Sequence, residues 1–177
     1  TEHGAGTLVG RVVEPNQVRI IRISDEAIPQ WSDDLVLPNG AVGEITVVGP
    51  TATERYFNRP DADRIGKISE GARTVHRMGD LGYFDDGGRL WMCGRRSQRV
   101  ETASGTICTE QVEPIFNVHP QVFRSALVSV GAKGQEEPVL IIELEPGVNR
   151  EEHERIREEL LAIAARHAHT RGIGKVL

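Results

Sequence analysis

A hairpin signal constrains the fold of this chain more than any other feature. Two short apolar stretches, residues 81–84 and 90–93, flank the sequence Asp85-Asp86-Gly87-Gly88. Asp-Gly and Gly-Gly steps tolerate the positive φ angles that tight hairpin turns require. The chain is therefore predicted to fold back on itself between the two stretches.

The predicted hairpin brings an acidic and a basic residue to one rim. If the turn centres between Asp86 and Gly87, Asp80 lies opposite Cys93, and Arg95 lies just beyond it. An ionised carboxylate can accept hydrogen bonds from two vicinal hydroxyls, and an adjacent arginine can reach a ribose oxygen or a phosphate. Asp80 and Arg95 are therefore candidates for binding a nucleotide sugar. The alternative is an ordinary surface ion pair, worth about 0–1 kcal/mol when exposed.

Three motifs, in this order and spacing, occur together in one enzyme family. They are Gly43-Glu44-Ile45-Thr46-Val47-Val48-Gly49-Pro50, then Tyr56-Phe57-Asn58-Arg59-Pro60, then Gly79-Asp80-Leu81-Gly82 with Gly94-Arg95. The chain resembles the adenylate-forming superfamily of acyl-CoA synthetases, luciferases and nonribosomal-peptide adenylation domains. The resemblance implies that ATP and Mg²⁺ are bound, with Asp80 on the ribose hydroxyls and Arg95 on the ribose or a phosphate.

The same resemblance implies a fold and a division into domains. The expected class is α+β, with a β-rich, barrel-like subdomain followed by a small α+β domain. Residues 1–95 are expected to be the C-terminal β-rich part of the large adenylate-binding domain. Residues 96–177 are expected to be the small, mobile C-terminal domain, incomplete here, with Arg96 and Ser97 at the hinge.

The segment after Arg95 departs from the usual acyl-CoA synthetase. Ser97 occupies the hinge position, where Asp or Lys is usual, and Glu101 stands where many relatives have lysine. A carboxylate in place of a cation disfavours an arriving CoA phosphate. The chain is more narrowly similar to the β-lactone synthetases of bacterial olefin biosynthesis, through the motifs at residues 76–80, 90–95, 99–103 and 109–114.

The narrower resemblance implies ATP-dependent adenylation of a β-hydroxy fatty acid, whose own hydroxyl then closes a β-lactone. Enzymes of the olefin pathway would be possible partners. Two alternatives stay open: a fatty acyl-CoA synthetase and a non-catalytic assembly module. The acyl chain length, the use of CoA and the oligomeric state are not specified by the sequence.

Two parts of the family's machinery are not found. No Ser/Thr/Gly-rich phosphate loop is present, so the chain is interpreted as a part of the enzyme that is inactive alone. Gly174-Lys175-Val176-Leu177 resembles the sequence around the catalytic lysine, but it follows the last expected helix without an intervening strand and loop. Lys175 is a weak candidate for that lysine, and an exposed terminal lysine is the alternative.

Composition excludes several other classes of function. A net charge of −5 and a pI near 5.7 argue against nucleic-acid binding. Two cysteines give no disulfide framework, and no apolar run approaches the ~18 residues of a membrane span, so a cytoplasmic protein without a transmembrane segment is expected. His167 and His169 are too close for two ligands on one helical face, so no protein-bound metal is predicted.

The expected elements follow the same division. The first part is predicted to be mostly strands, including residues 43–49, with a short helix over 51–58 capped by Thr51. The second part is predicted to contain a helix capped by Thr109 with Pro114 in or near its first turn, strands 122–130 and 138–144, and a last helix capped by Asn149.

Overall fold

The computed structural model describes residues 4–177, so the first three residues of the expected first domain lie outside the described part. The chain is α+β, as expected, and the described residues form more strands than helices. Contacts divide it into two compact units. One comprises Leu8–Ser97, and the other comprises Gln98–Leu177 with the described residues before Leu8.

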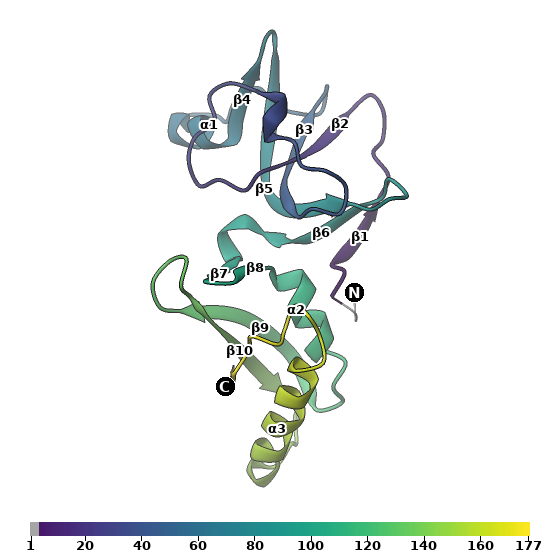
Figure 1. Ribbon diagram of the computed structural model, residues 1–177, viewed down its shortest axis with the longest axis vertical. Helices are drawn as coiled ribbons and strands as arrows, with labels where there is room; N and C mark the ends of the chain where they lie inside the picture. The colour runs from purple at the N-terminus through teal and green to yellow at the C-terminus, as the bar shows by residue number, and fades with distance from the viewer. Residues whose placement is uncertain (1–3) are drawn as a thin grey trace. The chain divides into compact units, whose positions relative to one another are not determined.

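The first unit is built on one curled sheet (Figure 1). The strand order is β1-β6-β5-β3-β2, and β4 pairs with β5 outside this path. Figure 1 shows β5 extending from its pairing with β4 to its pairing with β6. The strands are β1 (Thr7–Gly10), β2 (Gln17–Ile21), β3 (Gly43–Val48), β4 (Lys67–Glu70), β5 (Arg73–Phe84) and β6 (Leu90–Arg95).

Apolar side chains cover both faces of this sheet. Ile20 and Ile21 are consecutive in β2, so they point to opposite faces. Ile21 belongs to a cluster with Val48, Ile68 and Val75, while Ile20 belongs to another with Ile45 and Leu90. The connection between β2 and β3 contributes Ile28, Trp31 and Leu35 to the first cluster and Leu37 to the second. This long loop, with its 3₁₀ turn η1 (Asp33–Leu35), is therefore part of the core.

The helix of the first unit lies later in the chain than predicted. It is α1 (Pro60–Gly66), and the expected helix over residues 51–58 is wrong. Asn58 has a φ of 51°, which interrupts any right-handed helix there. Pro60 stands in the first turn of α1, where its missing N–H needs no partner. The backbone N–H of Tyr56 donates instead to Asp63 Oδ1 at 2.7 Å.

The second unit combines two small sheets with two helices. The 3₁₀ turn η2 (Arg96–Gln98) precedes it, and β10 stands between β11 and β9 in the larger sheet. The predicted strands 122–130 and 138–144 are confirmed to within one residue. The elements are β7 (Val100–Thr102), β8 (Gly105–Ile107), α2 (Thr109–Phe116), β9 (Val122–Val130), β10 (Glu137–Leu144), η3 (Arg150–Glu152), α3 (His153–Ala164) and β11 (Lys175–Val176).

One face of the larger sheet carries the core of this unit, and both helices pack on it (Figure 1). Leu127 and Leu140 are cross-strand partners and point to this face. The cluster continues through Val112, Ile115 and Phe116 of α2 and Ile156, Leu160 and Ala164 of α3. The predicted cap Asn149 forms a capping box with Glu152, and this box starts η3, which leads into α3.

The start of α2 differs from the prediction. Cys108 is the N-cap residue and no side chain caps the helix, so Thr109 is the first helical residue rather than the cap. Pro114 stands in the second turn, not the first. The helix ends two residues later at Phe116, so the proline removes only one hydrogen bond of a short helix.

Candidate functional site

The hairpin of β5 and β6 is longer and less regular than the sequence suggested. Phe84 pairs with Leu90, so the turn is centred on Gly87 rather than before it. The register then shifts: Gly82 pairs with Met92, but Leu81 pairs with Gly94. Cys93 is thus the extra residue of a β-bulge.

This bulge changes the partner of Asp80. The predicted pairing of Asp80 with Cys93 is wrong, because Asp80 stands directly opposite Arg95. Cys93 is fully buried, and Gly94 has a φ of 129°, in the region that favours glycine. The longer turn and the bulge together bring the two candidate residues closer than the sequence register implied.

Asp85 fixes the turn of this hairpin. Its carboxylate accepts hydrogen bonds from the Arg89 backbone N–H at 2.8 Å, the Arg89 Nε–H at 2.7 Å and the Trp91 indole N–H at 3.0 Å. These bonds, led by that of Trp91, lower the pKa of Asp85 to about 2. The turn that positions Asp80 and Arg95 is therefore held by side chains as well as by its backbone.

Asp80 and Arg95 form an ion pair through one carboxylate oxygen of Asp80. Arg95 Nη1 lies 3.0 Å from Asp80 Oδ1, and the side chains are 59% and 18% exposed, respectively. Asp80 Oδ1 is itself buried and has no hydrogen-bond partner among residues 4–177. The two atoms are thus within ion-pair distance without the alignment of a hydrogen bond. The arrangement offers a buried acceptor beside an exposed cation, which fits a ligand that carries hydroxyl donors and a negative charge.

The two predicted hinge residues lie directly after β6. Arg96 and Ser97 begin the 3₁₀ turn η2, and the boundary between the two compact units falls after Ser97. The Arg96 side chain is 18% exposed, and its Nη1 donates to the Ser24 carbonyl oxygen. Ser97 is exposed.

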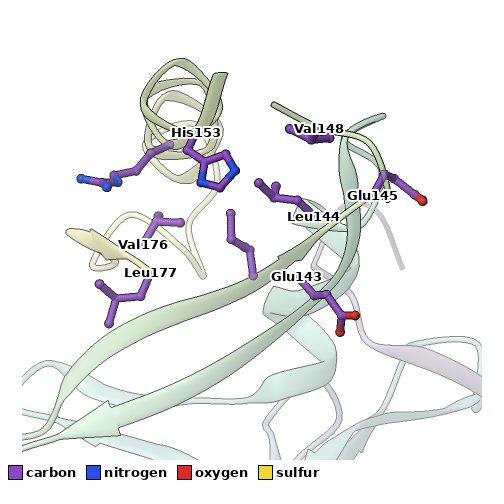
Figure 2. Close-up of a pocket in the computed structure, with 9 residues that line it drawn as sticks. Glu143, Leu144, Glu145, Val148, His153, Val176 and Leu177 are labelled. Carbon is purple, nitrogen blue, oxygen red and sulfur yellow. The ribbon is translucent and has the colours of Figure 1, made fainter. Parts of the chain in front are cut away.

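Lys175 stands in the two-residue strand β11, beside Val139 of β10, and is exposed. The next residue, Val176, is buried and lines a pocket of about 480 Å³. Figure 2 shows Leu144, Val148 and His153 around this pocket, with the Glu143 and Glu145 carboxylates turned away from it. The sequence did not indicate this pocket, whose lining combines apolar side chains with those of His153 and Arg157.

Sequence reasoning also gave no role to two buried charged residues in the first unit. Arg77 Nη2 lies 2.6 Å from Glu44 Oε2, and each side chain is 1% exposed. The sequence did contain a signal for this pair: each of the two residues is a charged residue inside an otherwise strand-like segment. A charged residue that is buried in a strand is almost always paired, so two such residues are candidates to pair with each other.

Three kinds of feature are absent from the described residues: metal-binding clusters, membrane-spanning helices and disulfides. Residues 4–177 contain no group of three or more His, Cys, Asp or Glu side chains that could hold a metal ion. None of the helices formed by these residues has the length and apolarity to cross a membrane. Cys93 and Cys108 are buried and form no disulfide within the described residues, and burial raises the pKa of Cys108 to about 11.

Comparisons with known proteins identify relatives of this chain. No protein-family model matches it. It is 59% identical over 182 residues to the olefin β-lactone synthetase of Xanthomonas campestris pv. campestris, a match that covers 100% of this chain and 33% of that protein. It is 56% identical over 170 residues to the olefin β-lactone synthetase of Stenotrophomonas maltophilia, covering 93% of this chain and 30% of that protein. The chain thus spans about a third of the length of the curated relatives it matches.

Solved structures show the same architecture. The amide bond synthetase McbA from Marinactinospora thermotolerans matches with a TM-score of 0.72 and 26% identity, over 96% of this chain and 31% of that one. The O-succinylbenzoate coenzyme A synthetase of Bacillus subtilis, solved with ATP and magnesium, matches with a TM-score of 0.73 and 23% identity, over 96% of this chain and 31% of that one. The second likeness supports the fold alone. The chain therefore belongs to the adenylate-forming superfamily of ligases, as a C-terminal portion similar to the olefin β-lactone synthetases.

Proposed function

We propose that this chain is part of an ATP-dependent ligase that adenylates a β-hydroxy fatty acid and closes it to a β-lactone, releasing pyrophosphate and AMP. The observation that carries the proposal is the 59% identity to an olefin β-lactone synthetase across the whole chain. The proposal includes Mg²⁺ with the ATP, a cytoplasmic location and other enzymes of olefin biosynthesis as partners.

Asp80 and Arg95 are proposed to bind the nucleotide. Asp80 Oδ1 is ion-paired with Arg95 but accepts no hydrogen bond among the described residues, so its carboxylate can accept from the ribose hydroxyls once Arg95 moves aside. Arg95 is more than half exposed, so its guanidinium can leave Asp80 and reach a ribose oxygen or a phosphate. ATP supplies the adenylyl group, while these two residues orient its sugar.

We further propose that residues 1–95 belong to the large nucleotide-binding domain and residues 96–177 to the small mobile domain. Arg96 and Ser97 would then be the hinge. The boundary between compact units after Ser97 supports this division. Lys175 is not proposed as the catalytic lysine, because it stands in a strand that pairs directly with β10 and follows α3 without an intervening longer strand.

A fatty acyl-CoA synthetase is the second candidate, and two observations keep it open. The charge of Glu101 was expected to disfavour CoA, but Arg99 Nη2 lies 2.8 Å and Lys133 Nζ 3.9 Å from its carboxylate oxygens. These cations offset the negative charge that Glu101 presents to an arriving phosphate. In addition, the chain is 34% identical over 131 residues to a 2-succinylbenzoate–CoA ligase of Bacillus mycoides.

The experiment that separates the two candidates supplies the complete enzyme with a β-hydroxy fatty acid and ATP, with and without CoA. Formation of β-lactone and AMP without CoA supports the proposed function. Strict dependence on CoA, with a thioester as the product, supports the second candidate and contradicts the first. A protein that forms neither product and whose gene encodes no glycine-rich phosphate loop would instead be a non-catalytic assembly module.

The chain by itself is proposed to be inactive and to bind ATP weakly. A dissociation constant of 1 μM corresponds to about −8 kcal/mol, which exceeds what one ribose contact and one arginine supply. Calorimetry of the chain with Mg²⁺ and ATP should therefore show no micromolar binding. A micromolar constant would mean that the chain contains a larger part of the nucleotide site than proposed.

A further inference from the structure

A buried carboxylate lies at the centre of the sheet that carries Asp80. Glu44 stands in β3 and pairs across the ladder with Leu81, the residue after Asp80. Its side chain is 1% exposed, and its Oε2 accepts hydrogen bonds from Arg77 Nε at 3.0 Å and Arg77 Nη2 at 2.6 Å. A buried charge of this kind persists only when it is paired and hydrogen-bonded.

Arg77 uses every N–H that a guanidinium offers. Two donate to Glu44, and the others donate to the carbonyl oxygens of Ser24 at 2.5 Å, Glu26 at 2.8 Å and Ile65 at 3.0 Å. Arg77 therefore connects three separate segments of the first unit, and it has no donor left for the second oxygen of Glu44.

That second oxygen faces the residue after Arg95. Glu44 Oε1 is buried and makes no hydrogen bond within the described residues, and Arg96 Nε lies 3.6 Å from it. The Arg96 Nη1 donates to the same Ser24 carbonyl that Arg77 binds. Glu44 thus attracts both guanidiniums, that of Arg77 in β5 and that of Arg96 in η2, directly after β6.

We propose that Glu44 and Arg96 are positioning residues for the nucleotide site. The attraction between them, with the bond from Arg96 to the Ser24 carbonyl, fixes the backbone directly after Arg95. Because Arg95 stands opposite Asp80, this also fixes the separation of the two residues proposed to bind the ribose. The inference rests on the proposed function, since it needs Asp80 and Arg95 to bind a nucleotide.

The test uses steady-state kinetics of the complete enzyme with ATP and a β-hydroxy fatty acid. Arg96→Gln removes the cation but leaves the Glu44 to Arg77 bonds in place. We expect the KM for ATP to rise about tenfold, which is about 1.4 kcal/mol, with the KM for the acid unchanged. Arg96→Lys should recover part of the loss, because it restores the charge near Glu44 Oε1. Arg22→Gln is the matched control, since it breaks an exposed pair with Asp34 in the same unit.

A second variant tests the partner. Glu44→Gln can keep its oxygen on Arg77 and then turns an N–H₂ group toward Arg96, so it should also raise the KM for ATP. In the double variant Glu44→Gln/Arg96→Gln, the fold-increase in the KM for ATP should be smaller than the product of the two single-variant increases, because both changes remove the shared attraction while Arg96→Gln also removes the bond to the Ser24 carbonyl. If Glu44→Gln fails to fold, the comparison of Arg96→Gln with Arg96→Lys decides the question.

The failures of the two proposals can be told apart. If Arg96→Gln raises both KM values equally, lowers only the melting temperature, or leaves the KM for ATP unchanged while Asp80→Asn raises it, the positioning role is wrong. If Asp80→Asn itself leaves the use of ATP unchanged, the proposed nucleotide site is wrong, and the positioning role falls with it.

Discussion

Asp80 and Arg95 are direct cross-strand partners because Cys93 is inserted as a bulge between them and the rest of the hairpin. Without the bulge, every residue of β6 beyond Met92 would be displaced by one position, and its side chains would change faces of the sheet. The bulged strand therefore determines that Arg95 points along the same face as Asp80. Bulges commonly re-aim a side chain next to a functional site in this way.

Replacing Asp80 should weaken the binding of ATP without unfolding the protein. In the complete enzyme, Asp80→Ala should remove two charge-assisted hydrogen bonds to the nucleotide sugar, each worth about 1.5–3 kcal/mol. Adenylation, measured as ATP–pyrophosphate exchange, should fall by roughly two to four orders of magnitude. Asp80→Asn should do less harm, because it keeps one acceptor without the charge.

The melting temperature is the control for this experiment. Asp80 Oδ1 has no hydrogen bond to lose among the described residues, so Asp80→Ala should remain folded. Exchange within threefold of wild type in a folded variant would make the carboxylate a structural residue of the hairpin, and the site assignment would have to be abandoned.

Arg77 should be much more important for stability than an exposed arginine. Arg77→Met leaves the buried Glu44 carboxylate without its partner, and breaking such a pair costs about 3–5 kcal/mol. Arg124→Met is the matched control, because the Arg124 and Glu143 side chains are 72% and 54% exposed and the pair is worth about 0–1 kcal/mol. Urea unfolding of the two variants measures both values.

Arg77→Lys provides a second measurement if Arg77→Met does not fold. Lysine keeps the charge but has three donors on one atom, so it cannot reach Glu44 and all three carbonyl oxygens. Its loss of stability should lie between those of the other two variants. Equal losses for Arg77→Met and Arg124→Met would show that the buried network contributes no more than a surface pair.

The sequence predicted most elements of this fold because their signals are local. The segment 43–49 was predicted to be a strand and forms β3, and Asn149 was predicted to cap the last helix and starts the turn that leads into it. The helix at residues 51–58 was a false prediction from a similar signal, Thr51 followed by Glu54. Its failure is physical: Asn58 takes up a left-handed conformation, and Pro60 starts a helix of its own further along the chain.

The site was only partly predictable, because its register and its buried charges depend on distant residues. The pattern around Asp80 and Arg95 indicated a carboxylate and a guanidinium on one rim. The bulge at Cys93 was not predicted, although Gly94 within residues 90–95 was a signal for it, because a glycine inside a strand often marks a bulge. Glu44 and Arg77 are 33 residues apart in the chain, so their pairing became visible only in the folded sheet.

Gly82 should tolerate no side chain. A Cβ there would lie 2.3 Å from the Trp91 carbonyl oxygen and 2.8 Å from Ile45 Cδ1, so Gly82→Ala forces the β5 and β6 backbones apart. We expect a loss of about 1–3 kcal/mol in the free energy of unfolding. Gly66→Ala is the control, because its Cβ would meet nothing closer than Tyr56 Cε2 at 3.4 Å. A Gly82→Ala variant as stable as Gly66→Ala would contradict the close approach of the two strands.

His76 should make the stability of the first unit depend on pH. It stands in β5 opposite Lys67, and its Nε2 lies 2.9 Å from the Tyr56 hydroxyl. Burial, and then the Lys67 ammonium, lower the pKa of His76 below its ordinary value of 6.5. Because the folded state resists protonation of this ring, the unfolded state binds more protons as the solution becomes acidic.

The sign of the effect follows from that difference in pKa. The contribution of His76 to stability is complete above pH 6.5 and is lost as the pH falls from 6.5 toward the lower pKa of the folded state. Urea unfolding followed between pH 7.5 and pH 5 should therefore show a decline that His76→Gln reduces, since glutamine can keep a hydrogen bond to Tyr56 without titrating. His153→Gln, which replaces an exposed histidine of α3, is the control for the loss of one histidine. NMR titration of the His76 ring gives the pKa directly, and a value at or above 6.5 would mean that the ring is open to water or has an acidic partner.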